Sequence, residues 1–140
     1  MNACSTSSIN QSQLVVGNIT NNSEYKGGAN PSQEILDALA IYRPSANQNF
    51  YIRNANNYSS FTNILGTFTT DNDGNYTITL AVGSYGILGQ EKYDFEQSPY
   101  ADSNCGYIQV PDFTLTVVAN QENYISQYTD KVNYCLAHPQ

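Results

Sequence analysis

The sequence predicts an all-β protein: a single β-sandwich of seven or eight strands with one short helix inserted near residues 31–40. Apolar residues alternate with polar ones from Gln48 onward, which is the period of a strand with one buried face. Turn-forming residues interrupt these runs at short intervals, and one segment only has the spacing of a helix. A length of 140 residues suits one domain, so we expect a flexible leader or lipoprotein tether over residues 1–12 and a single domain over residues 13–140.

The first elements are a strand and the inserted helix. Residues 14–19 form an apolar run that predicts the first strand, and Asn and Gly residues follow it as a turn region. Asn30 is a suitable N-cap and Pro31 fits the first helical position. Three apolar residues then lie on one helical face, and the helix should end before Pro44: Ile35, Leu36 and Leu39.

The remaining elements are predicted as strands. Alternation is regular at residues 50–53, 76–80 and 113–117. The segment from Ile64 to Leu80 is predicted to be a hairpin, because Asn72, Asp73 and Gly74 suit a three-residue loop that ends in a left-handed glycine. Further strands are expected at 84–88, 107–110, 113–119 and 124–128, and a long loop at 89–106, where apolar residues are few.

One run of residues resembles a known family. It reads Gly66-x-Phe68-x-Thr70-Asp71-x-x-Gly74-x-Tyr76-x-Ile78-x-Leu80-x-x-Gly83-x-Tyr85-x-Ile87. This pattern resembles the carboxypeptidase regulatory-like domains, which are prealbumin-like (transthyretin-like, Ig-like) sandwiches, and Val15-x-Gly17-x-Ile19 is similar to their first strand. The helix after Pro31 departs from that family. The resemblance implies a non-catalytic module with an adhesion or binding role at the cell envelope.

The charge balance limits the partners. Five basic residues and a net charge of −7 leave no basic surface that could neutralise phosphates, so we expect no nucleic-acid partner. The longest apolar runs have only a few residues, so we expect no transmembrane span. Asn, Gln, Ser and Thr make up more than a third of the chain, while charged residues make up 12%. We therefore expect an exported protein, periplasmic, outer-membrane-anchored or extracellular, with an envelope protein or polysaccharide as partner.

The three cysteines bear on the compartment. Cys105 and Cys135 are predicted to form a disulfide, which would stabilise the fold by about 3.5 kcal/mol through loop closure. The alternative is a pair of reduced, buried thiols in a cytosolic protein. Cys4 follows a small residue and precedes a Ser-rich segment, which resembles the cleavage site of a bacterial lipoprotein. Cys4 is thus either a lipid anchor or an incidental cysteine of the leader.

Enzymatic residues are scarce in the sequence. The single histidine, His138, lies three residues from the end of the sequence, so neither a Ser-His-Asp triad nor the iron and hydrolase sites of transthyretin-like enzymes can be built. We therefore expect that the chain is not an enzyme and that it binds no cofactor. Asp71, Asp73 and Asn75 offer oxygen ligands for calcium, but the position of Gly74 favours a turn over a calcium loop.

One loop combines aromatic and acidic residues and is the candidate binding site. Aromatic rings can stack on the apolar face of a ligand, and carboxylates can accept hydrogen bonds from its hydroxyl groups. The sequence therefore offers two interpretations of residues 91–107: a carbohydrate-binding loop, or a solvated structural loop attached at Cys105. The candidate ligand-binding residues are Tyr93, Phe95, Tyr100 and Tyr107.

Overall fold

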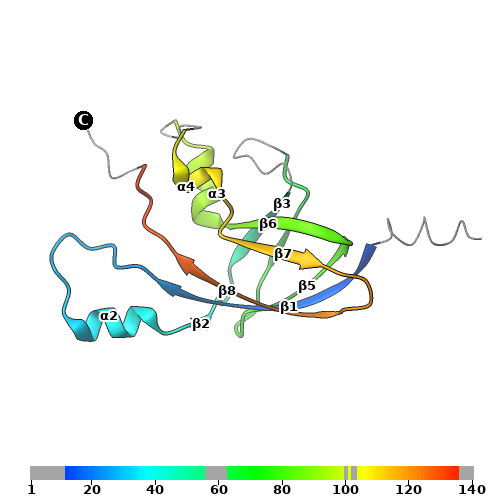
Figure 1. Cartoon of the computed structure of the whole chain (residues 1–140), viewed down its shortest axis with the longest axis horizontal. Coiled ribbons are helices and arrows are strands. Elements are labelled where there is room, and N and C mark those ends of the chain that lie inside the picture. Colours follow the sequence, from blue (N-terminus) through cyan, green and yellow to red (C-terminus); the bar gives the residue numbers. More distant parts are fainter. Residues whose placement is uncertain (1–11, 56–62, 100, 102–103, 136–140) are drawn as a thin grey trace, which may run out of the picture.

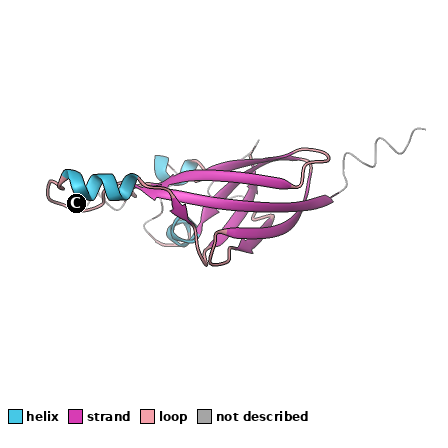
Figure 2. Ribbon diagram, turned by 90° about the horizontal axis from the view of Figure 1, so that it is seen from below, coloured by secondary structure: helices cyan, strands magenta, loops and turns pink. Residues whose placement is uncertain are grey.

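The computed structural model describes residues 12–55, 63–99, 101 and 104–135. In these ranges eight strands form two sheets that pack face to face, with short helices at the periphery (Figures 1 and 2). The predicted all-β sandwich is confirmed. The elements, in chain order, are β1 (Ser12–Ser23), α2 (Gln33–Ala40), β2 (Arg43–Pro44), β3 (Asn49–Asn54), β4 (Gly66–Thr69), β5 (Asn75–Ala81), β6 (Gly83–Gly89), α3 (Gln90–Glu96), α4 (Gly106–Gln109), β7 (Phe113–Val117) and β8 (Asn123–Asp130).

Strand β1 is the centre of the first sheet. It pairs antiparallel with β5, where Val16 lies opposite Thr77, and parallel with β8, where Val16 lies opposite Asn123. The short β2 pairs with the other end of β1, where Thr20 lies opposite Pro44. It lies on the same side of β1 as β5, because β8 occupies the other side over this stretch. The second sheet is antiparallel throughout, in the order β4-β3-β6-β7.

The core lies between the two sheets and follows the predicted alternation. Phe50 and Ile52 have no exposed surface, whereas Thr114 and Thr116 on β7 face solvent. Burying the inward side chains removes apolar surface from water, which is the main force that holds the sheets together. The core residues are Val15, Ile19, Phe50, Ile52, Phe68, Tyr76, Leu80, Tyr85, Ile87, Leu115, Val117 and Tyr124.

The hairpin predicted between Ile64 and Leu80 is wrong in its pairing. The turn forms, because the backbone N–H of Gly74 donates to the carbonyl of Asp71 at 3.1 Å. However, β4 belongs to the second sheet and β5 to the first, so this turn carries the chain across the sandwich. Gly74 has a φ of +82°, and a Cβ there would lie 2.5 Å from the carbonyl oxygen of Ile19, which is why glycine is required. Likewise β5 and β6, which follow each other directly, lie in different sheets.

The inserted helix is confirmed, with a different cap. Ser32, not Asn30, is the N-cap, and its hydroxyl accepts from the backbone N–H of Ile35 at 3.2 Å. Pro31 therefore precedes the helix instead of occupying its first turn. Helix α2 projects beyond one end of the sheets (Figure 2), and Ile35 is 46% exposed.

The long loop predicted at 89–106 contains one helix and leads into another. Residues 107–110 were expected to form a strand, but most of them belong to α4. Helices α3 and α4 lie together at the outer side of the second sheet (Figure 1). Lys92 and Glu96 are buried one turn apart on α3, beside Phe95. This buried stripe includes two charged residues, so it lacks the apolar period by which a helix is identified from sequence.

Candidate functional site

A disulfide joins the start of α4 to the segment after β8. Cys105 is the N-cap residue of α4, and its Cα lies 6.0 Å from that of Cys135. The predicted bridge is confirmed, and it encloses α4, β7 and β8 in one covalent loop. Cys4, the predicted lipid anchor, and the leader around it lie outside the described residues.

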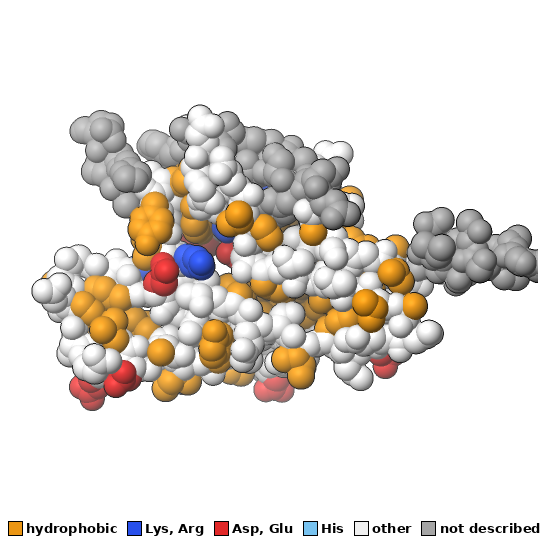
Figure 3. Space-filling view, viewed as in Figure 1, with side chains coloured by type: hydrophobic (Ala, Val, Ile, Leu, Met, Phe, Trp, Pro, Cys, Tyr) orange, Lys and Arg blue, Asp and Glu red, His pale blue; other side chains and the backbone are white. Residues whose placement is uncertain are grey.

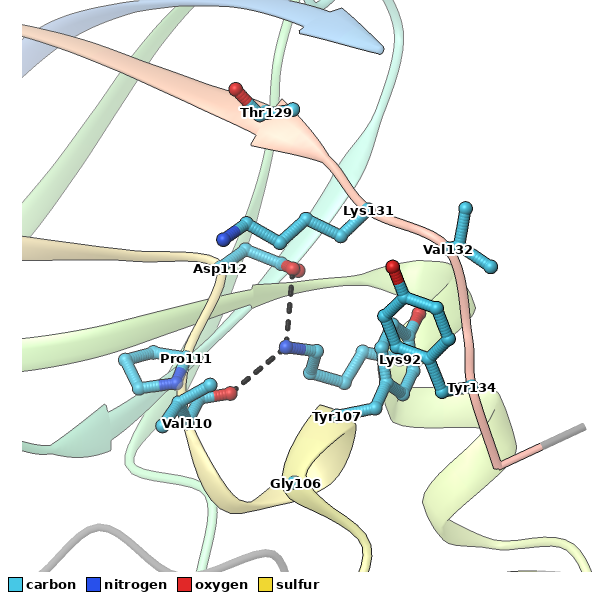
Figure 4. Close-up of a pocket in the computed structure, with 10 residues that line it drawn as sticks. All are labelled: Lys92, Gly106, Tyr107, Val110, Pro111, Asp112, Thr129, Lys131, Val132 and Tyr134. Carbon is cyan, nitrogen blue, oxygen red and sulfur yellow. Dashed lines mark hydrogen bonds and ion pairs between the residues drawn. The ribbon is translucent and has the colours of Figure 1, made fainter. Parts of the chain in front are cut away.

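Lys92 of α3 is buried at the centre of the site. Its ammonium donates to the carbonyl of Val110 at 2.9 Å and lies 3.3 Å from Oδ1 of Asp112 (Figure 4). It also lies 4.6 Å from the centroid of the Tyr107 ring, a cation–π distance. The other oxygen of Asp112 accepts from the backbone N–H of Gly89 at 2.7 Å. These contacts fasten α3, α4 and the segment before β7 to one another.

A second buried ion pair holds α3 against the sheet. Both guanidinium Nη atoms of Arg53 on β3 donate to the carboxylate of Glu96, at 2.9 and 2.8 Å. The two side chains are 3% and 0% exposed. Burial raises the pKa of Glu96, and the neighbouring positive charges of Arg53 and Lys92 oppose that rise. The bidentate geometry fixes the orientation of α3 on β3.

A cavity of about 270 Å³ lies between α4 and the segment that follows β8. Lys92 and Tyr107 lie on its inner side, and Lys131 and Tyr134 come from the C-terminal segment (Figure 4). Tyr134 is 59% exposed. Tyr107 is partly buried, and this burial raises the pKa of its hydroxyl. The remaining lining residues are Gly106, Val110, Pro111, Asp112, Thr129 and Val132. This volume is close to the lower end of small-molecule sites.

A smaller, polar recess of about 90 Å³ lies on the other side of Tyr107 and Asp112. Glu91 and Asp130 line it, and Lys26 lies 3.7 Å from the first carboxylate and 3.0 Å from the second. Desolvation alone would lower the pKa of Lys26, but the two carboxylates outweigh it and raise the pKa. The recess is thus flanked by an exposed ion-pair network.

The predicted ligand-binding aromatic residues are brought together only in part. Phe95 and Tyr107 meet edge to face, with centroids 6.2 Å apart, but Phe95 is 7% exposed. Tyr93 stacks on Tyr51 of β3 at 3.9 Å, away from the cavity lining. Tyr100 lies outside the described residues. Of the three that are described, Tyr107 alone lines the cavity.

The other cavity residues were not predicted. Lys92 lies among acidic residues in the segment expected to be a loop, and Asp112 lies between two predicted strands. Lys131 and Tyr134 lie beyond the last predicted strand. The proline of the run Val110-Pro111-Asp112 and the nearby cysteines are the local signals that the backbone is constrained in this segment. Which side chains line the cavity depends on how β8 pairs with β1, and local patterns do not determine that pairing.

The proposed calcium ligands belong to the turn between β4 and β5. Oδ1 of Asp71 accepts from the backbone N–H groups of Asp73 and Asn75, both at 2.9 Å. These bonds lower the pKa of Asp71. The carboxylate therefore stabilises the turn, as the alternative interpretation predicted. Within the described ranges, no cluster of three or more His, Cys, Asp or Glu residues is arranged to hold a metal ion.

Comparisons with known proteins identify structural neighbours only. No protein-family model and no curated protein matches the chain. Among solved structures, the shaft pilin SpaA of Lactobacillus rhamnosus GG is 18% identical over 86% of this chain and 52% of its own, with a TM-score of 0.43. The chain thus spans about half the length of that structure. The Bacillus anthracis TIE protein is 17% identical over 84% of this chain and 17% of its own, with a TM-score of 0.40. The major pilin SpaD of Corynebacterium diphtheriae is 10% identical over 85% and 32%, with a TM-score of 0.38.

The described residues contain the helices α2, α3 and α4, of which α2 is the longest with eight residues. None of them is long and apolar enough to cross a bilayer.

Proposed function

We propose that this chain is an exported, non-catalytic module that binds or scaffolds other molecules at the cell envelope, of the carboxypeptidase regulatory-like type. The observation that carries the proposal is the Cys105–Cys135 disulfide, which joins the start of α4 to the segment after β8 beside the cavity. Structural disulfides persist in oxidising compartments and are rare in the cytosol. The low charge content supports the same setting, and Cys4 is the proposed lipid attachment point.

The charged groups of the site support a binding role over a catalytic one. Lys92 is held by Asp112 and by the carbonyl of Val110, and Arg53 is held by Glu96. A general base or nucleophile must reach its substrate, whereas these groups are buried in ion pairs that fasten α3 and α4. They give the cavity rigid walls, which lowers the entropy cost of binding.

Export is tested in cells that express the natural full-length precursor. Lysine residues of an exported chain react with a membrane-impermeant amine reagent added to intact cells, while a cytosolic control protein does not react. When thiols are alkylated before lysis, Cys105 and Cys135 should remain unmodified, because they are joined in a disulfide. A chain that is unlabelled and carries two free thiols would contradict the proposal. The double variant Cys105→Ser/Cys135→Ser is the matched control for the alkylation readout.

Carbohydrate binding is the second candidate, and one observation favours it. The exposed ring of Tyr134 borders a cavity that also presents Thr129 and Lys131, so a sugar could stack on the ring and bond to the polar groups. Cosedimentation with purified envelope polysaccharide should therefore fall at least tenfold in Tyr134→Ala. Tyr42→Ala is the control, because Tyr42 is 43% exposed and does not line the cavity. An equal loss in both variants, or no binding by the parent chain, would exclude this candidate.

A further inference from the structure

Among the described residues, strand β8 pairs only with β1, so its other edge is free. The pairing with β1 uses the even-numbered residues of β8, since the Val16 N–H donates to the Glu122 carbonyl and the Glu24 N–H to the Asp130 carbonyl. In a parallel pair, the backbone groups of alternate residues point toward the partner, so those of Asn123, Ile125, Gln127 and Thr129 point away from β1. Within the described ranges, the Asn123 carbonyl alone of this outward set has a partner, the side chain of Gln121.

This edge lacks the features that usually protect sheet edges. Natural edges are shortened, bulged, or carry charges or proline. In contrast, β8 has eight residues, no proline, and no charged residue from Asn123 to Thr129. Ile125 is 84% exposed, the highest value among the large apolar side chains in the described ranges. Figure 3 shows that charged side chains are few on the face that carries β1 and β8.

We propose that β8 is a self-association edge, on which a second copy of this chain pairs antiparallel with its own β8. The strand is self-complementary in the register that pairs residues 123–129 of one copy with residues 123–129 of the other. In that register Ile125 of one copy lies opposite Gln127 of the other, and Asn123 lies opposite Thr129, so the outward residues form four hydrogen-bonding pairs. The two four-stranded sheets would then join into one continuous sheet.

Charge predicts how the contact between two copies should respond to salt. Each copy carries a net charge of −7, and in this register Glu122 of one copy lies opposite Asp130 of the other, so two copies repel one another. Added salt screens the repulsion between the copies but leaves backbone hydrogen bonds almost unchanged. Raising the salt concentration should therefore strengthen the dimer.

The test measures the oligomeric state of the full chain by sedimentation velocity from about 1 to 500 μM, a range that brackets a micromolar dimer. We expect a monomer–dimer equilibrium that shifts toward the dimer with salt. Gln127→Pro removes an N–H that points away from β1, so the monomer keeps its own pairing and the dimer weakens at least tenfold. Amide exchange at Ile125 should slow as the protein concentration rises.

A matched pair of charge variants separates the edge from the rest of the sheet. Ile125→Lys places a charge on the edge, whereas Thr79→Lys makes the same change in net charge on β5, at an exposed position of the same sheet. The first should weaken the dimer at least tenfold and the second should not weaken it. A chain that stays monomeric over the whole range would overturn the proposal. So would a dimer unaffected by both Gln127→Pro and Ile125→Lys, because it would use another surface.

Discussion

Replacing Asp112 with Asn is expected to destabilise the fold more than replacing its partner Lys92 with Met. The Lys92 side chain is 4% exposed and the Asp112 side chain 14% exposed, and the ammonium lies 3.3 Å from the carboxylate. Breaking a buried ion pair by removing one partner costs about 3–5 kcal/mol, and the partial exposure of Asp112 places this pair near 3 kcal/mol. Asp112→Asn leaves the positive charge of Lys92 buried without its carboxylate. For a chain of this size the melting temperature should fall by about 6–12 °C.

Lys92→Met should cost less, about 1–2 kcal/mol, because the remaining carboxylate keeps its bond from the Gly89 N–H at 2.7 Å and reaches solvent. Met keeps the length of the buried stem, so the loss is electrostatic rather than a packing defect. The double variant should cost at least 1 kcal/mol less than the sum of the two single variants, since neither charge is then left alone.

The assay is urea unfolding followed by circular dichroism for the parent chain, both single variants and the double variant. Asp130→Asn is the control: it breaks the ion pair with Lys26, whose side chains are 38% and 36% exposed, and should cost about 0–1 kcal/mol. A cost of Asp112→Asn below that of the control would contradict a buried, coupled ion pair, and so would two single effects that simply add in the double variant.

Three further outcomes are expected. The variant Cys105→Ser/Cys135→Ser should lose about 3.5 kcal/mol of unfolding free energy, and reductant should lower the stability of the parent chain to the same value but leave the variant unchanged. Gly74→Ala should cost more than about 1 kcal/mol in urea unfolding, because it forces a positive φ and a contact with the backbone of β1. Two backbone N–H groups hold the pKa of Asp71 below 3.8, so its stabilising effect is present above that pH and is lost as the pH falls through the lower folded value. The stability difference between the parent chain and Asp71→Asn, measured by thermal unfolding from neutral to acidic pH, should therefore shrink only at low pH.

The sandwich and its core could be predicted from the sequence because alternation is a local property. Phe50 and Ile52 lie on the face of their strand that covers the core, so they are buried whichever strands are its neighbours. Pairing is not local. The segments before and after Gly74 have the pattern of a hairpin, yet the second pairs with β1, far away in the sequence. The same turn residues are compatible with a turn within one sheet and with a turn that connects two sheets.

The cavity could not be predicted for a related reason. Lys92 and Glu96 occur one helical turn apart, which is typical of a solvated helix face. They are buried because Asp112 and Arg53, which come from distant segments, meet them there. The prediction from aromatic rings among carboxylates included Tyr107, which lines the cavity, but none of the residues opposite it. Those come from the segment after β8, and their place follows from the parallel pairing with β1.

The disulfide lies beside the cavity and closes the loop that contains β8, whose edge is free. Strand β8 pairs in parallel with β1, the first strand, so this pairing closes a loop that contains most of the domain, and closing so long a loop costs entropy. The bond between Cys105 and Cys135 restricts the unfolded states of the segment that contains β8, and so offsets part of that cost. The same bond holds α4 beside the residues that complete the cavity. Reduction should therefore raise amide exchange in β8 and α4 more than in β3 or β6, and both proposed surfaces would be retained best where the disulfide is stable.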